Sequence, residues 1–376
     1  MIKIISVGDI MPGGLLTGNP NPCANEDVLN LLLQGDVRCG TLECALGNEP
    51  SYDPKKMVDS GDGIYSNVIY AKDDDVKRLR ELHINVVSLA NNHFFDLGEE
   101  GALHTIELLD KVGVLHCGAG KNLEEAGKSV VLEIKGKKVA FLGFCDTEYK
   151  HVYMCTYATQ DSPGINPMKE DYVVSEIKKN TALYDYVVVL AHWGREHTFY
   201  PDLSTDKMAR MMLKAGAIAV LGSHPHRVQP VINTKKRTIV YSMGNFLFPE
   251  RLIAPPKVTY YPDAPICYST LPITDKYPIV DCVTLKTLPF LARVGLIVNT
   301  TIEKHTVKSK YDFSYLNSNN CIELLGEDKS KEIQNSLSTI SVALDMNQYK
   351  RYLKLLHYKN VIVYRLKKMM KKGKNI

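Results

Sequence analysis

The feature that most constrains the fold of this chain is the alternation of strand-like and helix-like segments through its first two thirds. The strand-like segments are short apolar runs such as "INVVSLA" and "YVVVLAH", and the segments between them repeat apolar residues every three or four positions. Residues 99–112 show this helical spacing, and Gly113 is well placed to end that helix. The order predicts an α/β protein in which helices cover buried sheets.

Polar residues gather where the predicted strands end. They are Asp9, Asn92, His93, Asp146, His192 and His224. In α/β folds, ligands bind at the carboxyl edge of the sheet, because buried strands position the side chains and the following loops leave them accessible. One such coincidence means little, but its repetition along one chain predicts a functional site at this edge.

The chain changes character in its last third. Residues 251–290 are rich in Pro and Tyr and predict a long loop or lid over the site. The run "ARVGLIVNTTIEKHTVKSK" predicts an exposed pair of strands, and residues 322–368 predict one or two helices. Earlier, "KSVVLEIKGKKVAFLGFCD" predicts a hairpin that turns near Gly136, and "RTIVYSMGNFLF" predicts one strand with its exit loop. We therefore expect a domain over 1–300 and a C-terminal extension over 301–376.

The formal net charge of +4 arises from the C-terminus, because residues 350–376 contain ten Lys or Arg and no acid. The rest of the chain is mildly acidic. A nucleic-acid binder normally carries its basic surface on the folded domain, so this class of partner is excluded. The basic segment is either a solvated terminus or a contact with an anionic membrane, at about 1 kcal/mol per basic residue near the surface.

No apolar stretch approaches the roughly 20 residues that span a bilayer, and "MIKIISVGD" does not read as a secretory leader. The nine cysteines form no CxxC pair, which favours reduced thiols, or buried Cys used as small hydrophobes. We expect a cytoplasmic protein whose basic tail allows peripheral contact with the membrane. The sequence leaves the oligomeric state open.

The sharpest local signal is "GSHPH" at 222–226, where His224 and His226 flank one residue directly after a predicted strand. Imidazole is the commonest neutral metal ligand, and it suits ions of the Mn, Fe and Zn class. The alternative is two loop histidines, one of which bonds the backbone. His192 ends another strand in "VVVLAHWGREH", and its alternative is a satisfied core histidine beside Trp193.

Two acids and an asparagine extend this set of candidate ligands. Asp9 offers a carboxylate, although a turn aspartate explains it as well. Glu43 lies in an apolar run, where an acid needs a partner or a metal ion. The side-chain oxygen of Asn92 can bind a cation without adding charge, which leaves His93 as an acid or a positioned donor. Asp96 can orient His93 through its ring N–H, whereas a turn built from Asn-Asn explains the asparagines alone.

These segments occur together in a familiar order. Over roughly residues 1–250, "SVGDIMPGG", "TLECAL", "SLANNHFFDLGEEGALHTIELLDKVGVLHCGAG", "LAHWGREH", "LGSHPHRVQPV" and "VYSMGNFLF" resemble the motifs of CapA-like proteins of poly-γ-glutamate capsule biosynthesis. That family is similar to the calcineurin-like metallophosphoesterases. The resemblance implies a four-layer α/β/β/α sandwich, one or two divalent metal ions and hydrolysis of phosphoesters.

Carried over by motif, the resemblance implies a role for each candidate. The first metal would be bound by two acids and a histidine, namely Asp9, Glu43 and His226. The second would be bound by Asn92, His192 and His224. His93 would be the catalytic histidine, oriented by Asp96, while Arg195 and Glu196 would contact substrate unless they form a surface ion pair. Met11 stands where the superfamily has a histidine ligand, which depletes the first site.

We therefore expect a metal-dependent phosphoester hydrolase that acts on a phosphorylated or anionic polymer-related substrate in capsule or other cell-surface polymer biosynthesis. Two alternatives stay open. The first is a non-catalytic or single-metal accessory factor in the assembly of an anionic polymer. The second is a γ-glutamyl amide hydrolase, which uses similar metal chemistry.

Overall fold

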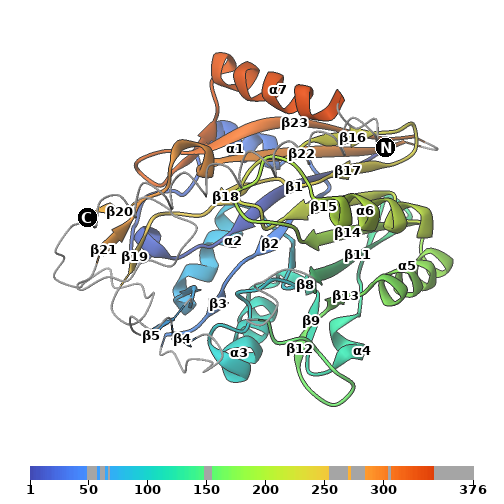
Figure 1. Cartoon of the computed structure of the whole chain (residues 1–376), viewed down its shortest axis with the longest axis horizontal. Helices are drawn as coiled ribbons and strands as arrows, with labels where there is room; N and C mark the ends of the chain where they lie inside the picture. Colours follow the sequence, from blue (N-terminus) through green and yellow to red (C-terminus); the bar gives the residue numbers. More distant parts are fainter. Residues whose placement is uncertain are drawn as a thin grey trace, which may run out of the picture. The chain divides into compact units, whose positions relative to one another are not determined.

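The structure is a computed structural model that describes residues 1–48, 57–59, 64–66, 68–147, 155–253, 270–271, 284–303 and 306–342. By contact the chain divides into two compact units, Met1–Gly326 and Glu327–Ile376. In the second unit, the described part is the helix α7 (Glu327–Val342). The sheets and the other helices belong to the first unit (Figure 1).

The first sheet has the order β24–β23–β22–β1–β2–β7–β8. Its parallel strands are β1 (Ile2–Ile10), β2 (Val37–Leu42), β7 (Val86–Ser88), β8 (Leu115–Cys117) and, beside β1, β18 (Asn245–Leu247). Its antiparallel strands are β22 (Val294–Glu303), β23 (Thr306–Leu316) and β24 (Ile322–Leu324). Because β1, β2 and β7 run in one direction, their carboxyl ends meet at one edge of the sheet.

The second sheet has the order β10–β11–β14–β15–β17–β16. Its parallel strands are β11 (Lys137–Asp146), β14 (Tyr186–His192), β15 (Ala219–Ser223), β17 (Thr238–Val240) and, beside β11, β13 (Pro167–Met168). The antiparallel edges are β10 (Val130–Ile134) and β16 (Val231–Asn233). The runs β11 and β14 are almost wholly buried, as expected of parallel strands covered on both faces.

Short elements complete the first unit. The remaining strands are β3 (Ala45–Leu46) with β6 (Tyr70–Ala71), β4 (Met57–Asp59) with β5 (Ile64–Ser66), β9 (Ala119–Gly120) with β12 (Gly164–Ile165), and β19 (Arg251–Ile253) with β21 (Thr284–Lys286) and β20 (Thr270–Leu271). The α-helices are α1 (Glu26–Leu32), α2 (Lys77–Glu81), α3 (Gly98–Val112), α4 (Leu123–Ala126), α5 (Glu170–Leu183) and α6 (Leu203–Ala215). The 3-10 turns are η1 (Gly14–Leu16), η3 (Asp73–Val76) and η5 (Phe290–Ala292).

Helices cover the outer faces of both sheets (Figure 1). Outside the second sheet, α5 and α6 bury their apolar stripes in a core that includes Phe144, Val189, Ile177 and Met212. Outside the first sheet, α1, α2 and α3 contribute to a core that includes Val7, Val28, Leu79 and Leu109. Each such fully buried side chain contributes about 1.5–3 kcal/mol, so both helical layers are firmly held.

The inner faces of the sheets meet through small residues. Strands β1, β2 and β7 of one sheet contact β15, β14 and β11 of the other. Thr41 and Ser223 form a hydrogen bond of 3.0 Å across this interface. A Cβ added at Gly143 would lie 2.6 Å from the Ser88 hydroxyl, so the contact there requires glycine. This confirms the predicted four-layer α/β/β/α sandwich.

The segment "RTIVYSMGNFLF" differs from its prediction, because it forms two strands in different sheets. Strand β17 belongs to the second sheet, and β18 pairs with β1 in the first. The chain crosses between them at Gly244, which adopts a φ of 66° and accepts a hydrogen bond of 3.0 Å from the backbone N–H of Asp9. A Cβ at Gly8 would lie 1.8 Å from the Gly244 oxygen, so glycine permits this close approach.

The predicted pair of strands after residue 290 exists, and the prediction that it is exposed holds for alternate residues of β23 but not for β22. Strand β22 lies between β1 and β23, and its residues are mostly buried. The expected boundary near residue 300 therefore falls inside β22, and the first unit extends to Gly326. Residues 322–324 form β24, so the terminal helix begins at Glu327, later than predicted.

Two turn predictions are confirmed by backbone geometry. Lys135 and Gly136 have φ values of 52° and 72° and join β10 to β11, as a two-residue hairpin turn requires. Gly113 ends α3 with a φ of 73°. Most of the predicted lid at 251–290 and all of the basic segment 350–376 lie outside the described residues. Among the described helices, none is long and apolar enough to span a bilayer.

Candidate metal centre

The carboxyl edges of both sheets bring the predicted ligands together. Asp9 ends β1, Glu43 follows β2, Asn92 follows β7, and His192 ends β14. The loop after β15 carries His224 and His226. Three groups among the described residues have ligand atoms within 4.8 Å of one another, and they are Glu43–His192–His224, Asp9–Glu43–His226 and Glu196–His224–His226.

Glu43 lies at the centre of this cluster. Its Oε1 is 3.6 Å from His192 Nε2 and 3.5 Å from His226 Nε2. Asp9 lies on the other side of the same rings, 3.9 Å from His192 Nδ1 and 3.6 Å from His226 Nδ1. Because Glu43 belongs to two of the three ligand groups, its carboxylate is placed to be shared between two cations.

Asn92 joins the cluster through His192. The Asn92 Oδ1 lies 2.7 Å from His192 Nε2, the same ring nitrogen that faces Glu43. The rings of His192 and His224 have centroids 4.6 Å apart. The Asn92 amide oxygen and the rings of His192 and His224 thus lie close together.

The buried acids fit a cation. Asp9 and Glu43 have no exposed surface, yet Asp9 Oδ1 and both Glu43 oxygens have no hydrogen-bond partner in the described part of the chain. Burial raises the pKa of Asp9 to about 7. Burial, followed by the nearby Asp9 carboxylate, raises the pKa of Glu43 well above its usual value. A divalent ion would supply the positive charge that two adjacent buried carboxylates need.

The histidine rings are prepared to act as neutral ligands. His192 Nδ1 lies 3.0 Å from the Ser223 hydroxyl, and His226 Nδ1 lies 2.7 Å from Asn245 Oδ1. Each contact leaves Nε2 facing Glu43, and such outer partners fix the orientation of ligating imidazoles. Burial also lowers the pKa of His226 well below its usual value, which keeps the ring uncharged. Nitrogen and oxygen ligands together suit Mn, Fe or Zn.

Positive φ values occur in the loops that follow β14 and β15. His224 and His226 adopt positive φ values of 92° and 51°, and His197 adopts 60°. Such conformations cost non-glycine residues about 1–3 kcal/mol each, and they persist where the surrounding structure enforces them for function. Two ordinary loop histidines would not need such strained conformations, so the strain supports a functional role for "GSHPH".

Met11, which stands where the superfamily has a histidine, belongs to an apolar core. Its side chain is fully buried within the apolar core that also contains Phe246 and Phe248. The residues predicted to remain as ligands of the first site, Asp9, Glu43 and His226, have ligand atoms that lie together.

His93 and Asp96 form a hydrogen-bonded pair beside the ligands. His93 Nδ1 lies 2.7 Å from Asp96 Oδ2, and both side chains are buried. Asp96 Oδ2 also accepts a hydrogen bond from the backbone N–H of Ile69, so the carboxylate is held in place. His93 contributes to the lowered pKa of His226, so its ring lies within electrostatic range of the cluster.

Several residues that position the site were not predicted from the sequence. Asn91, assigned only to a turn, donates from Nδ2 to the Leu42 carbonyl at 2.8 Å and accepts from the His93 N–H at 3.0 Å. It therefore ties the His93 loop to the strand that precedes Glu43. Ser223 and Asn245 orient the two ligating rings. Ser223 reaches His192 from the neighbouring strand of the same sheet, whereas Asn245 reaches His226 from the other sheet.

The two predicted substrate contacts separate in the structure. The Arg195 side chain is 65% exposed and faces Asp202, with 3.8 Å between Nε and Oδ2. Glu196 instead belongs to a ligand group with His224 and His226. Asp146, noted at a strand end, accepts a hydrogen bond from the Gly194 N–H and supports the loop after β14.

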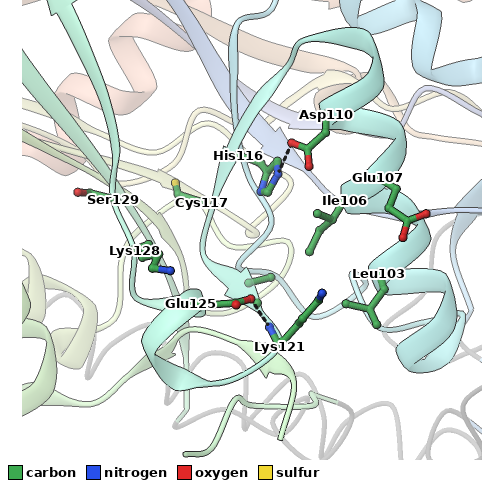
Figure 2. A pocket seen from close by; sticks show the side chains of 12 residues that line it. Leu103, Ile106, Glu107, Asp110, His116, Cys117, Lys121, Glu125, Lys128 and Ser129 are labelled. Carbon is green, nitrogen blue, oxygen red and sulfur yellow. Dashed lines mark hydrogen bonds and ion pairs between the residues drawn. The ribbon is translucent and has the colours of Figure 1, made fainter.

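A surface pocket of about 410 Å³ lies elsewhere, between α3 and residues 116–129 (Figure 2). Some of its charged side chains already interact with one another or with the backbone. His116 lies 3.2 Å from Asp110, and Glu125 accepts a hydrogen bond from the Lys121 N–H at 3.1 Å. None of the predicted ligands lines this pocket. The buried cluster is therefore the better candidate for a catalytic site.

Known proteins similar to this chain are named for capsule and polyglutamate synthesis. This chain is 35% identical over 184 residues to the capsule biosynthesis protein CapA of Bacillus anthracis. The match covers 47% of this chain and 43% of that protein. The chain is 34% identical over 179 residues to the PGA biosynthesis protein CapA of Bacillus subtilis, covering 46% and 45% of the two chains. The chain thus spans about half the length of these curated relatives.

Among solved structures, a candidate 5′-nucleotidase from Staphylococcus aureus matches with a TM-score of 0.44 and 11% identity, covering 90% of this chain and 58% of that one. A 5′-nucleotidase from Candida albicans matches with a TM-score of 0.37 and 12% identity, covering 69% and 48%. The family model described as "Bacterial capsule synthesis protein PGA_cap" matches residues 3–250, a span that contains all of the ligands described above. The chain therefore belongs to the bacterial capsule synthesis PGA_cap family.

Proposed function

We propose that this protein is a metal-dependent phosphoester hydrolase that serves the synthesis of a capsule or another anionic cell-surface polymer. The observation that carries the proposal is the central position of Glu43, which is shared by the Asp9–Glu43–His226 and Glu43–His192–His224 groups. A carboxylate between two cation sites would help to hold two ions, which in two-metal hydrolysis stabilise the attacking and the leaving oxygen. Membership of the PGA_cap family supports the link to capsule synthesis.

In this mechanism, divalent ions supply Lewis acidity and lower the pKa of water. The residues of the chain hold and orient the reacting groups. Ser223 and Asn245 fix the rings of His192 and His226, so that Nε2 of each faces the Glu43 carboxylate. His93, held by Asp96, is placed to donate a proton or a hydrogen bond to the leaving oxygen.

The direct test uses the full chain with Mn²⁺, Fe²⁺ or Zn²⁺. We expect about two metal equivalents per chain by elemental analysis and hydrolysis of bis-p-nitrophenyl phosphate or p-nitrophenyl phosphate. A γ-glutamyl p-nitroanilide substrate, assayed in parallel, examines the amide hydrolase alternative. Two bound ions with hydrolysis of neither phosphoester would overturn the proposal, and release of nitroaniline alone would favour the amide reaction.

A non-catalytic role is the second candidate, and a relative's name favours it. A protein of Mycobacterium tuberculosis that is 26% identical over 179 residues is named as a probable polyglutamine synthesis accessory protein. In this role the chain would hold one ion or none, act in the cytoplasm and contact anionic lipid through the basic segment 350–376. A metal content of one or zero per chain, with no turnover, would support it over hydrolysis.

The pKa of Asp9 predicts how metal binding depends on pH. Without metal, the folded chain keeps a proton on Asp9 up to about pH 7, while the unfolded chain releases it near its usual pKa of 3.8. The stability of the metal-free protein therefore falls as pH rises from about 4 to 7. Added Mn²⁺ removes this penalty at high pH but competes with protons at low pH.

We expect Mn²⁺ to raise the melting temperature more at pH 8 than at pH 5, as measured by calorimetry with and without chelator. The variant Asp171→Asn, which changes an exposed acid on α5, should show the same pH dependence as the unmodified protein. Equal gains at both pH values would show that Asp9 does not take part in metal binding.

A further inference from the structure

Arg251 is a buried cation beside the metal cluster. It lies in β19, where its backbone pairs with Lys286 of β21, and the residue is 7% exposed. Its guanidinium carbon lies 5.4 Å from the centre of the Phe248 ring. The other neighbour of that ring is His226, whose centroid is 5.1 Å away. Phe248 thus contacts both Arg251 and a predicted metal ligand.

No carboxylate in the described part of the chain forms an ion pair with Arg251. Its Nε has no hydrogen-bond partner there either. The adjacent acid, Glu250, is engaged elsewhere, because it accepts hydrogen bonds from the Arg293 guanidinium and, at 3.2 Å, from the Leu288 N–H. A buried charge is costly unless it is paired, so a guanidinium held in this way is suited to bind an anion.

The charges around the cluster indicate which anion this is. Arg251 lies over the Phe248 ring that also packs against His226, so its positive charge is close to the ligands of the cluster. Once cations bind the acids of the cluster, Arg251 adds a further positive charge on the Phe248 side. The planar guanidinium presents a fork of N–H donors that matches the oxygens of phosphate, and stacking on an aromatic ring fixes the plane of that fork.

We propose that Arg251 binds a phosphate oxygen of the substrate next to the metal centre. The assignment rests on the proposed function and gives Arg251 the role that the sequence had suggested for Arg195. Arg195 is mostly exposed and already faces Asp202, whereas Arg251 is buried and lies over the Phe248 ring, which also contacts His226. Arg251 is therefore a residue that would select phosphorylated substrates.

The test measures binding of inorganic phosphate to the full chain by isothermal titration calorimetry, in the presence of Mn²⁺. It needs no turnover, so a failure of the hydrolase proposal is seen separately in the phosphoester assay. We expect Arg251→Met to weaken phosphate binding by about tenfold or more, which is the usual loss for a charge-assisted hydrogen bond. Arg251→Lys keeps the charge but loses the fork, and should give an intermediate loss.

The matched control is Arg80→Ala, which removes the same charge from an exposed position on α2 and should leave phosphate binding unchanged. Melting temperature separates a binding role from a structural one. A cation kept for an external anion is a burden to the free protein, so Arg251→Met should hold or raise the melting temperature without phosphate. A large drop would assign Arg251 to the fold and overturn the proposal.

The same titration with L-glutamate examines a carboxylate in place of phosphate. Weakened phosphate binding in Arg251→Met, with glutamate binding weak or absent throughout, supports the proposal. Phosphate binding that is equal in Arg251→Met and the unmodified protein, or absent from the unmodified protein, overturns it. An Arg251→Met effect on glutamate alone would also overturn the assignment to phosphate.

Discussion

Replacing Glu43 with Gln is expected to abolish hydrolysis while stabilising the metal-free protein. The amide keeps the shape of the side chain but removes the charge shared by two ligand groups. We expect metal content to fall and phosphoester hydrolysis to drop by about 10³-fold or more, because a metal centre contributes several kcal/mol to the transition state.

Stability should change in the opposite direction. The pKa of Glu43 is raised well above its usual value by burial and by Asp9, so the metal-free fold must keep a proton that the unfolded chain releases at neutral pH. In Glu43→Gln this penalty is absent, and we expect the free energy of unfolding at pH 7.5 in chelator to rise by about 1–3 kcal/mol. Denaturant unfolding with chelator or with Mn²⁺ measures both effects.

Glu133→Gln, at an exposed position on β10, is the control for loss of one acid and should change neither metal content nor stability by more than about 0.5 kcal/mol. If Glu43→Gln unfolds more easily in chelator than the unmodified protein, the view of Glu43 as a strained ligand is wrong. Retention of two ions in this variant would likewise contradict its shared position.

Replacing His93 with Ala should lower kcat by about 10²–10⁴-fold without loss of metal, the range expected for a general acid. His93 belongs to none of the three ligand groups, and its Nδ1 is engaged by Asp96 at 2.7 Å. Asp96→Asn keeps an acceptor for the Ile69 N–H but no longer stabilises a charged ring. We expect a loss of about 10–100-fold for that variant.

Because the two residues act as a unit, the double variant should be no slower than His93→Ala alone. The matched control is His116→Ala, which breaks the His116–Asp110 contact at the pocket in Figure 2 and should leave kcat unchanged. Steady-state kinetics measures kcat of each variant, and elemental analysis measures its metal content. Loss of metal from His93→Ala, or losses that multiply in the double variant, would show that His93 is a structural or ligating residue.

Much of the candidate site could be read from local sequence. Asp9, His192 and His224 end or follow apolar runs, and Asn92, His93 and Asp96 lie within five residues of one another. Such spacing survives folding because a buried strand fixes the side chains at its carboxyl end. The same local logic predicted the α3 helix with its Gly113 end and the hairpin turn at Gly136.

Other features depend on contacts that are distant along the chain. Asn245 orients His226 only because the chain crosses from β17 in one sheet to β18 in the other, a change that apolar spacing does not reveal. Strand β22 looked like an exposed edge, yet it pairs with β1 in the interior of the sheet. Arg251 and Arg195 are both arginines near the motifs, and burial alone separates them.

The sequence by itself determined the α/β class, the family motifs and which residues can bind a metal, since these depend on residue type and on spacing within one strand and its loop. The tertiary structure decided that Glu43 is shared by two groups of ligands and that Arg251 lies over the Phe248 ring. The reason is physical. Ligand type is a property of a single side chain, whereas sharing, burial and charge pairing arise only when strands far apart in the chain are brought together.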